Sequence, residues 1–181
     1  MTTKVFTLSN ILSLSRIALL IPMVGMLYAT SWPHHRLYAI VVVMLGMVTD
    51  FLDRYFARKY NEVSELGKII DPLADKICVA VIVVILAVTG DIPLWYMAIV
   101  LARDVLIFFG GVYVKMKKGV VLASMMSGKV AVVFIALTLT FALLGNPLFA
   151  LVVLIFMWFS IGAMGLSVAV YGKRFFEVLK Q

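Results

Sequence analysis

The sequence predicts an all-α integral membrane protein, a bundle of six transmembrane helices. Three observations favour this class. Hydrophobic residues make up 64% of the 181 residues, the mean hydropathy is +1.12 and only 14% of residues are charged, whereas a soluble domain is about 45–50% apolar. Apolar runs recur at about 20 residues, the length that a helix needs to cross a bilayer. Basic residues gather in the short segments between these runs.

Six apolar runs are long enough to cross the hydrocarbon layer. They occupy residues 11–30, 37–58, 67–88, 93–114, 122–144 and 147–171. The polar start, Met1 to Asn10, is expected to lie along the membrane surface as a short interfacial helix. Further runs follow the first too closely for it to be a signal peptide. We expect residues 1–181 to form a single domain.

Turn and charge signals separate the runs. The predicted connections are residues 31–36, 59–66, 89–93, 115–119 and 145–147. Each of them contains Gly, Pro or charged residues, which interrupt an apolar helix. Four glycines inside the later runs are expected to permit close helix contact: Gly110, Gly111, Gly162 and Gly165.

The distribution of Lys and Arg predicts the orientation in the membrane. The N-terminal segment, the connections after the second and fourth runs and the C-terminal segment hold nearly all of them, and the other three connections hold only Arg36. Short cytoplasmic segments carry the excess of Lys and Arg. We therefore expect a multi-pass protein of the cell (inner) membrane with both termini cytoplasmic. The net charge of +7 fits anionic lipid headgroups rather than nucleic acid.

Four aspartates stand near the end of the second run and the start of the third, on the predicted cytoplasmic side. Asp50 and Asp53 share a helix face at i,i+3, as do Asp71 and Asp75 at i,i+4. Crowded carboxylates in a low dielectric must be protonated, paired or neutralised by cations. Oxygen-only ligation favours two Mg²⁺ or Mn²⁺ ions with open positions for phosphate oxygens. A structural cluster of salt bridges and an ion pathway remain alternatives.

The segment from Asp50 to Asp75 reads D-x2-D-R-x2-A-R-x8-G-x3-D-x3-D. It resembles the signature of the CDP-alcohol phosphotransferase family, D-x2-D-G-x2-A-R-x8-G-x3-D-x3-D, with every spacing kept and one letter changed. The resemblance implies a six-helix membrane enzyme, commonly a homodimer, with the motif bridging the second and third helices. The implied reaction transfers a substituted phosphate from a CDP-linked donor to an alcohol and releases CMP.

The resemblance also implies roles for the motif residues. Two divalent ions on the donor diphosphate would be held by Asp50, Asp53, Asp71 and Asp75. Asp75 is also the candidate general base for the acceptor hydroxyl. The donor nucleotide and diphosphate would be bound by Asp50, Ala57, Arg58 and Gly67, although Ala57 or Gly67 alone would more often indicate helix packing.

Arg54 departs from the family pattern, because it stands where the family has Gly. Its side chain would crowd the cytidine pocket, turn outwards to the headgroups or pair with Asp50 at i,i+4. The metal ligands are unchanged in each case.

The acceptor alcohol is predicted from a second resemblance. The start, Asn10-Ile-Leu-Ser-Leu-Ser-Arg16, resembles the N-x-L-[ST]-x2-R opening of bacterial phosphatidylglycerophosphate synthases, which implies CDP-diacylglycerol and glycerol 3-phosphate as substrates. The cations expected to bind the acceptor phosphate are Arg103, Lys117, Lys118 and Lys129. Arg103 and Asp104 are equally open to a structural pairing. Apolar residues follow Lys129 where these synthases have polar ones, so phosphatidylglycerol and inositol phosphate remain alternative acceptors.

Two other classes of function stay open. An ion or proton transporter would need carboxylates spread across the depth of the membrane, whereas these four cluster at one side. A structural membrane protein with an inactive site is compatible with Arg54, although the retained metal ligands argue against it.

Overall fold

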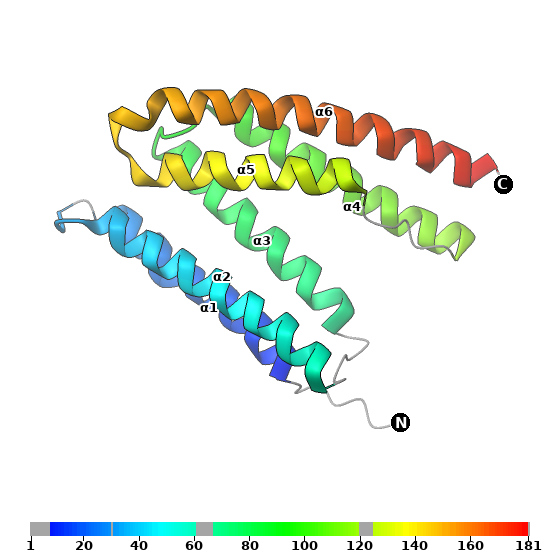
Figure 1. The fold of residues 1–181 in the computed structure, drawn as a ribbon, viewed down its shortest axis with the longest axis horizontal. Coiled ribbons are helices and arrows are strands. Elements are labelled where there is room, and N and C mark those ends of the chain that lie inside the picture. Colours follow the sequence, from blue (N-terminus) through cyan, green and yellow to red (C-terminus); the bar gives the residue numbers. More distant parts are fainter. Residues whose placement is uncertain (1–7, 30, 61–66, 120–124, 181) are drawn as a thin grey trace. The chain divides into compact units, whose positions relative to one another are not determined.

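The computed structural model describes residues 8–29, 31–60, 67–119 and 125–180. Side chains are described in these ranges except those of 8–14, 16, 17, 47, 50–60, 67–72 and 180. The described residues form six α-helices and one 3₁₀ turn (Figure 1). The elements are α1 (Leu8–Tyr28), α2 (His35–Tyr60), α3 (Gly67–Val88), α4 (Leu94–Lys118), α5 (Met126–Leu144), η1 (Pro147–Phe149) and α6 (Ala150–Lys180).

The described helices confirm the all-α class and make this a multi-pass membrane protein. Among them, three are long and apolar enough to cross a membrane by length and composition: Leu94–Lys118, Met126–Leu144 and Pro147–Leu179. Shorter apolar segments, Ala18–Tyr28 and His35–Gly46, lie in α1 and α2. The predicted interfacial helix falls mostly on residues 1–7, which lie outside the described residues.

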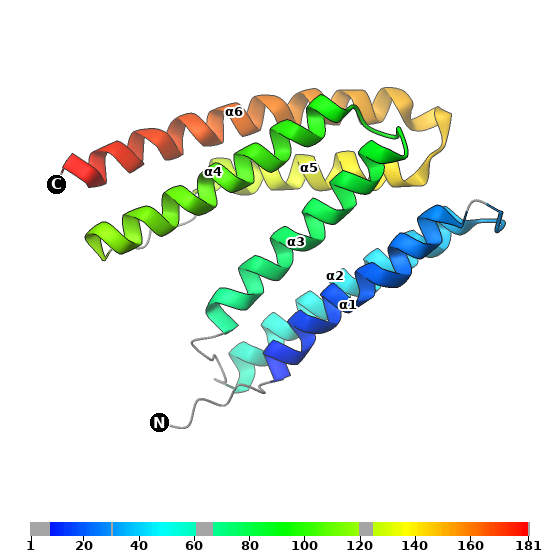
Figure 2. The ribbon, with the colours of Figure 1, turned by 180° about the vertical axis from the view of Figure 1, so that it is seen from behind.

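The chain divides into two compact units, Met1–Ile85 and Leu86–Gln181, with the boundary near the end of α3. In the first unit, α1 and α2 lie side by side in both views (Figures 1 and 2). Met23 and Leu27 of α1 and Ala39 of α2 are buried. The two helices are joined by a tight turn at 31–34, within the connection that the sequence predicted.

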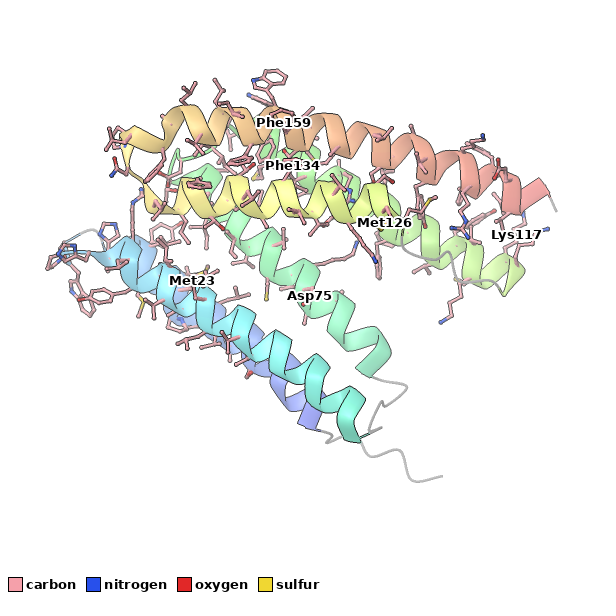
Figure 3. All side chains as sticks on the ribbon, in the orientation of Figure 1. Met23, Asp75, Lys117, Met126, Phe134 and Phe159 are labelled. Carbon is pink, nitrogen blue, oxygen red and sulfur yellow. The ribbon has the colours of Figure 1, made fainter. Side chains whose placement is uncertain are left out.

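The second unit contains α4, α5 and α6, and α6 packs against both other helices. Phe134 of α5 stacks on Phe159 of α6 with ring centroids 5.6 Å apart, and Figure 3 shows the two rings between these helices. A second pair, Phe141 and Phe156, stacks at the same distance. Aromatic pairs of this kind contribute about 0.5–1.5 kcal/mol each beyond the area they bury, so they stabilise the hairpin of α5 and α6.

A buried hydrogen bond joins α4 to α6. The hydroxyl groups of Tyr96 and Ser160 are 2.8 Å apart, and both side chains are fully enclosed. Ser160 also donates to the carbonyl oxygen of Met157 at 2.7 Å. Polar groups in an apolar bundle are stable only when they find such partners, so this contact fixes how the two helices meet.

The largest differences between the predicted and observed helix ends are in the second unit. The predicted connection 115–119 is wrong, because α4 continues to Lys118 and ends at Gly119, whose φ of 68° suits glycine. Helix α6 continues to Lys180 rather than 171, and α5 begins at Met126 rather than 122. Hydropathy marks where the apolar run ends, whereas a helix with basic residues continues into the headgroup layer.

The end of α5 is as predicted. Gly145 has a φ of 60°, which ends the helix, and its N–H donates to the carbonyl oxygen of Ala142. The Asn146 side chain then accepts a hydrogen bond of 3.0 Å from the N–H of Leu148, which caps η1.

Candidate functional site

The acidic motif occupies the C-terminal part of α2 and the first half of α3, in the first unit. Asp50 and Asp53 lie about one turn apart in α2, and Asp71 and Asp75 lie about one turn apart in α3. The helices therefore give each aspartate pair the spacing that the sequence predicted. The connection between the two pairs, residues 61–66, lies outside the described residues.

Asp75 is the motif aspartate whose side chain is described, and it is half-buried on α3 (Figure 3). The preceding residue, Ala74, is buried with 1% exposure. The side chains of the other three aspartates lie outside the described part, and among the side chains described no group of three or more His, Cys, Asp or Glu residues could hold a metal ion. The predicted metal site thus stays a prediction.

The predicted nucleotide-binding residues flank the connection between the two helices. Ala57 and Arg58 lie near the end of α2, one turn after Arg54, and Gly67 is the first residue of α3. Their side-chain contacts fall outside the described residues. The backbone places all of them near these two helix ends, together with the aspartates of the same helices.

The second unit contains a buried arginine. Arg103 is 8% exposed in the middle of α4, and its Nη1 lies 2.6 Å from Oδ1 of Asp104. Its Nη2 donates to the carbonyl oxygen of Gly128 in α5 at 3.4 Å and to Oγ of Ser167 in α6 at 3.3 Å. The structural pairing that the sequence left open is therefore present, and one guanidinium links three helices.

Arg103 contacts the first turn of α5. This helix begins after Met125, whose side chain makes no cap hydrogen bond. Two buried polar atoms here have no hydrogen-bond partner among the described residues, namely Nε of Arg103 and Oγ of Ser127. Lys129, two residues later, is exposed. An uncapped helix start next to a cation favours negatively charged or oxygen-rich ligands.

The other two predicted cations lie at the C-terminal end of α4. Lys117 and Lys118 are exposed, as Figure 3 shows for Lys117. Nζ of Lys117 is 5.7 Å from the centre of the Tyr113 ring and 3.5 Å from its hydroxyl. This cation–π contact holds the ammonium group while leaving it accessible.

Ser167 was not identified from the sequence, since only Gly162 and Gly165 were singled out in the last apolar run. Ser160 and Ser167 are two turns apart and both are buried, with exposures of 0% and 3%. A polar side chain repeated on one face of an otherwise apolar helix is a signal for interhelical hydrogen bonding. This pattern can identify Ser160 and Ser167 from the sequence, but it does not identify their partners on α4, Tyr96 and Arg103.

Comparison with known proteins identifies the family. The CDP-alcohol phosphatidyltransferase family matches residues 6–168 of the chain. The matched range includes the acidic motif, Arg103, Lys129 and Ser167.

Curated relatives carry two kinds of name. The CDP-diacylglycerol–glycerol-3-phosphate 3-phosphatidyltransferase of Rickettsia bellii is 36% identical over 100 residues, which cover 55% of this chain and 55% of that protein. The enzyme of the same name from Bacillus subtilis is 34% identical over 110 residues, which cover 55% of this chain and 57% of that protein. The cardiolipin synthase (CMP-forming) of Streptomyces coelicolor is 33% identical over 114 residues, 59% of this chain and 50% of that protein. The chain thus spans about half the length of the curated relatives it matches. Because the family match covers most of its length, the chain belongs to the CDP-alcohol phosphatidyltransferase family.

Proposed function

We propose that this protein transfers the phosphatidyl group of CDP-diacylglycerol to glycerol 3-phosphate, giving phosphatidylglycerophosphate and CMP for phospholipid biosynthesis. The observation that carries the proposal is the acidic motif, complete in its four aspartates and distributed over α2 and α3. Two of the relatives described above are named for this reaction, which supports the choice of acceptor.

The chemistry of the donor set fits a pair of Mg²⁺ or Mn²⁺ ions. Carboxylate oxygens are the ligands that these hard cations prefer, and the ions would be held by Asp50, Asp53, Asp71 and Asp75. When bound, such ions neutralise the charge that develops on phosphoryl oxygens and on a departing phosphate. Each pair of aspartates lies one turn apart on a helix, the spacing at which two carboxylates reach a shared ligand.

The protein's own residues would then carry the transfer. The oxygen of the acceptor hydroxyl forms a bond to the phosphorus that bears the diacylglycerol, and the bond from that phosphorus to CMP breaks. The hydroxyl proton passes to the carboxylate of Asp75. Arg58 contacts the diphosphate and the departing CMP through its planar guanidinium, while Asp50, Ala57 and Gly67 complete the nucleotide-binding residues.

An anionic acceptor needs positive charge to bind its phosphate. We assign direct contact with this phosphate to the exposed second-unit lysines Lys129, Lys117 and Lys118. Arg103 is buried and paired with Asp104, so it would add positive charge near the start of α5 without touching the phosphate. The buried polar atoms of Ser127 and Arg103 at the start of α5 add hydrogen-bonding capacity beside Lys129.

A second acceptor is favoured by one observation. The Streptomyces coelicolor relative is named as a CMP-forming cardiolipin synthase at nearly the same identity as the other two. Phosphatidylglycerol would then replace glycerol 3-phosphate, with the same donor and the same release of CMP. Inositol phosphate is a further acceptor compatible with the motif.

The proposed setting is the cell (inner) membrane. We propose a single family domain of six spans, with both termini and the acidic motif on the cytoplasmic side, where CDP-diacylglycerol is reached from the bilayer and the acceptor from solvent. The distribution of basic residues supports this orientation. We further propose a homodimer, as the family resemblance implies.

The test is CMP release by the purified full chain in mixed micelles with CDP-diacylglycerol and Mn²⁺ or Mg²⁺. Glycerol 3-phosphate, phosphatidylglycerol and inositol phosphate are supplied in separate reactions, each with and without EDTA. The proposal expects CMP release that needs glycerol 3-phosphate and stops with EDTA. Release with phosphatidylglycerol alone would establish the second acceptor, and no release with any of them would favour an inactive or transporting protein.

A further inference from the structure

Arg103 is held on two sides by groups on other helices. Nη2 faces Gly128 of α5 and Ser167 of α6, while Nη1 pairs with Asp104 of its own helix. A guanidinium is planar and rigid, so three partners at once define its orientation as well as its position. In a bundle with few polar groups, each such partner also offsets the cost of burying the charge.

The α5 side of this network is the first turn of the helix. Gly128 follows Ser127, whose hydroxyl has no hydrogen-bond partner among the described residues, and it precedes the exposed Lys129. Helix ends are the least constrained part of a helix because their backbone groups lack intrahelical partners, and Met125 provides no side-chain cap. The hydrogen bond from Arg103 therefore restrains the turn that presents Lys129.

We propose that Arg103, Asp104 and Ser167 are positioning residues, which hold the first turn of α5 so that Lys129 meets the acceptor phosphate. The inference rests on the proposed function, in which Lys129 binds that phosphate. Arg103 acts through the helix turn because its exposure is only 8% and both of its Nη atoms are already engaged.

Ser160 provides a matched control for Ser167. Both are buried serines of α6, and each hydrogen-bonds a side chain of α4, Tyr96 for Ser160 and Arg103 for Ser167. Replacing either by Ala removes one buried interhelical hydrogen bond. Only Ser167→Ala removes a hydrogen bond to Arg103. An effect seen in Ser167→Ala but not in Ser160→Ala therefore comes from the loss of that bond rather than from a general loss of stability.

The experiment measures amide hydrogen exchange of residues 126–129 in detergent, together with the KM values for glycerol 3-phosphate and CDP-diacylglycerol. We expect Ser167→Ala to speed exchange in this turn and to raise the KM for glycerol 3-phosphate by about threefold to tenfold, the effect of losing one hydrogen bond of ordinary strength. The KM for CDP-diacylglycerol and kcat should stay within about twofold. Ser167→Thr, which keeps the hydroxyl, should restore both readouts, and Ser160→Ala should change neither.

Four outcomes would overturn the inference. Unchanged exchange in Ser167→Ala, or equal acceleration in Ser160→Ala, would show that Ser167 does not restrain this turn. Arg103→Lys that raises the acceptor KM without changing exchange would show direct contact with the phosphate instead. If Ser167→Ala speeds exchange but leaves the KM for glycerol 3-phosphate unchanged, Ser167 restrains the turn but Lys129 does not bind the acceptor phosphate. The two failures are distinguishable because amide exchange is measured without substrate or turnover.

Discussion

The hydroxyl of Tyr171 donates a hydrogen bond of 3.2 Å to the carbonyl oxygen of Ile107, and the two residues are 64 positions apart. Tyr96 and Ser160 have the same separation, as do Arg103 and Ser167. Because the separation is constant, α4 and α6 run parallel and keep one register over about three turns. Figure 2 shows the two helices side by side, and this register brings Arg103 to Ser167.

The close approach of α4 and α6 at Tyr171 gives a first prediction. A Cβ atom at Gly111 would lie 3.0 Å from the Tyr171 hydroxyl, so the Tyr171 side chain must shift by a few tenths of an ångström in Gly111→Ala. We expect this shift to offset the stability of about 1 kcal/mol that Ala gains over Gly inside a helix. The measurement is unfolding in mixed detergent. In the Tyr171→Phe background the same change should stabilise the protein, because the oxygen that must shift is gone. Gly162→Ala, with nothing described within 4 Å, is the control.

The acidic motif gives a second prediction. Asp71→Asn and Asp75→Asn should each lower CMP release at least about 100-fold, since each loses a charge that binds metal or accepts the proton. Size-exclusion profiles should remain those of the folded protein. Asp91→Asn, in the loop where Asp91 accepts a 2.5 Å hydrogen bond from Thr89, should keep its activity. Turnover at the normal rate in Asp71→Asn or Asp75→Asn would refute the site assignment.

Metal binding should also be visible without activity. A ligand at about 100 times its Kd stabilises the folded state by about 2.7 kcal/mol. We therefore expect Mn²⁺ to raise the apparent Tm of the wild-type chain in detergent and EDTA to reverse the rise. The double variant Asp50→Asn, Asp53→Asn should show no rise. A rise of equal size in that variant would mean that Mn²⁺ binds elsewhere.

Arg54 gives a prediction about the donor. If its side chain crowds the cytidine pocket, Arg54→Gly should lower the KM for CDP-diacylglycerol by several-fold, although glycine costs a helix about 1 kcal/mol. Arg54→Ala removes the side chain without that backbone effect and should lower the KM similarly. An unchanged KM in both variants would indicate that Arg54 turns away from the nucleotide.

Much of the fold was predictable because hydropathy reports directly on helices in a bilayer. Gly145 and Pro147 predicted the end of α5 correctly, since a residue with positive φ and a residue without an N–H both end helices. The prediction that the fourth helix ends at residue 114 was wrong, because α4 continues to Lys118. Its basic residues mark the membrane surface rather than the helix end.

Pairing between distant helices was not predictable. Gly110 and Gly111 were expected to allow close contact, and they do lie against Tyr171. A Cβ atom added at Gly162 or Gly165 would instead meet no atom of another described helix within 4 Å. The difference depends on the register of α4 and α6, which no local pattern specifies. Fixed motif spacing identified the four aspartates, but the partner of Arg103 on α6 depends on that same register.

The adjacency of Arg103 and Asp104 has a consequence for biogenesis. An isolated arginine at the centre of a helix opposes insertion by about 2.5–3.5 kcal/mol, and at about 5–20 residues per second Ser167 is synthesised about 3–13 s later. Asp104 is synthesised directly after Arg103, and its Oδ1 lies 2.6 Å from Nη1 in the folded protein, so we expect the two charges to pair during insertion. We expect Asp104→Asn to impair insertion of α4, measured by glycosylation mapping, whereas Ser167→Ala should leave it normal. On this expectation, the ion pair would let α4 enter the bilayer before α6, which completes its polar contacts, has been synthesised.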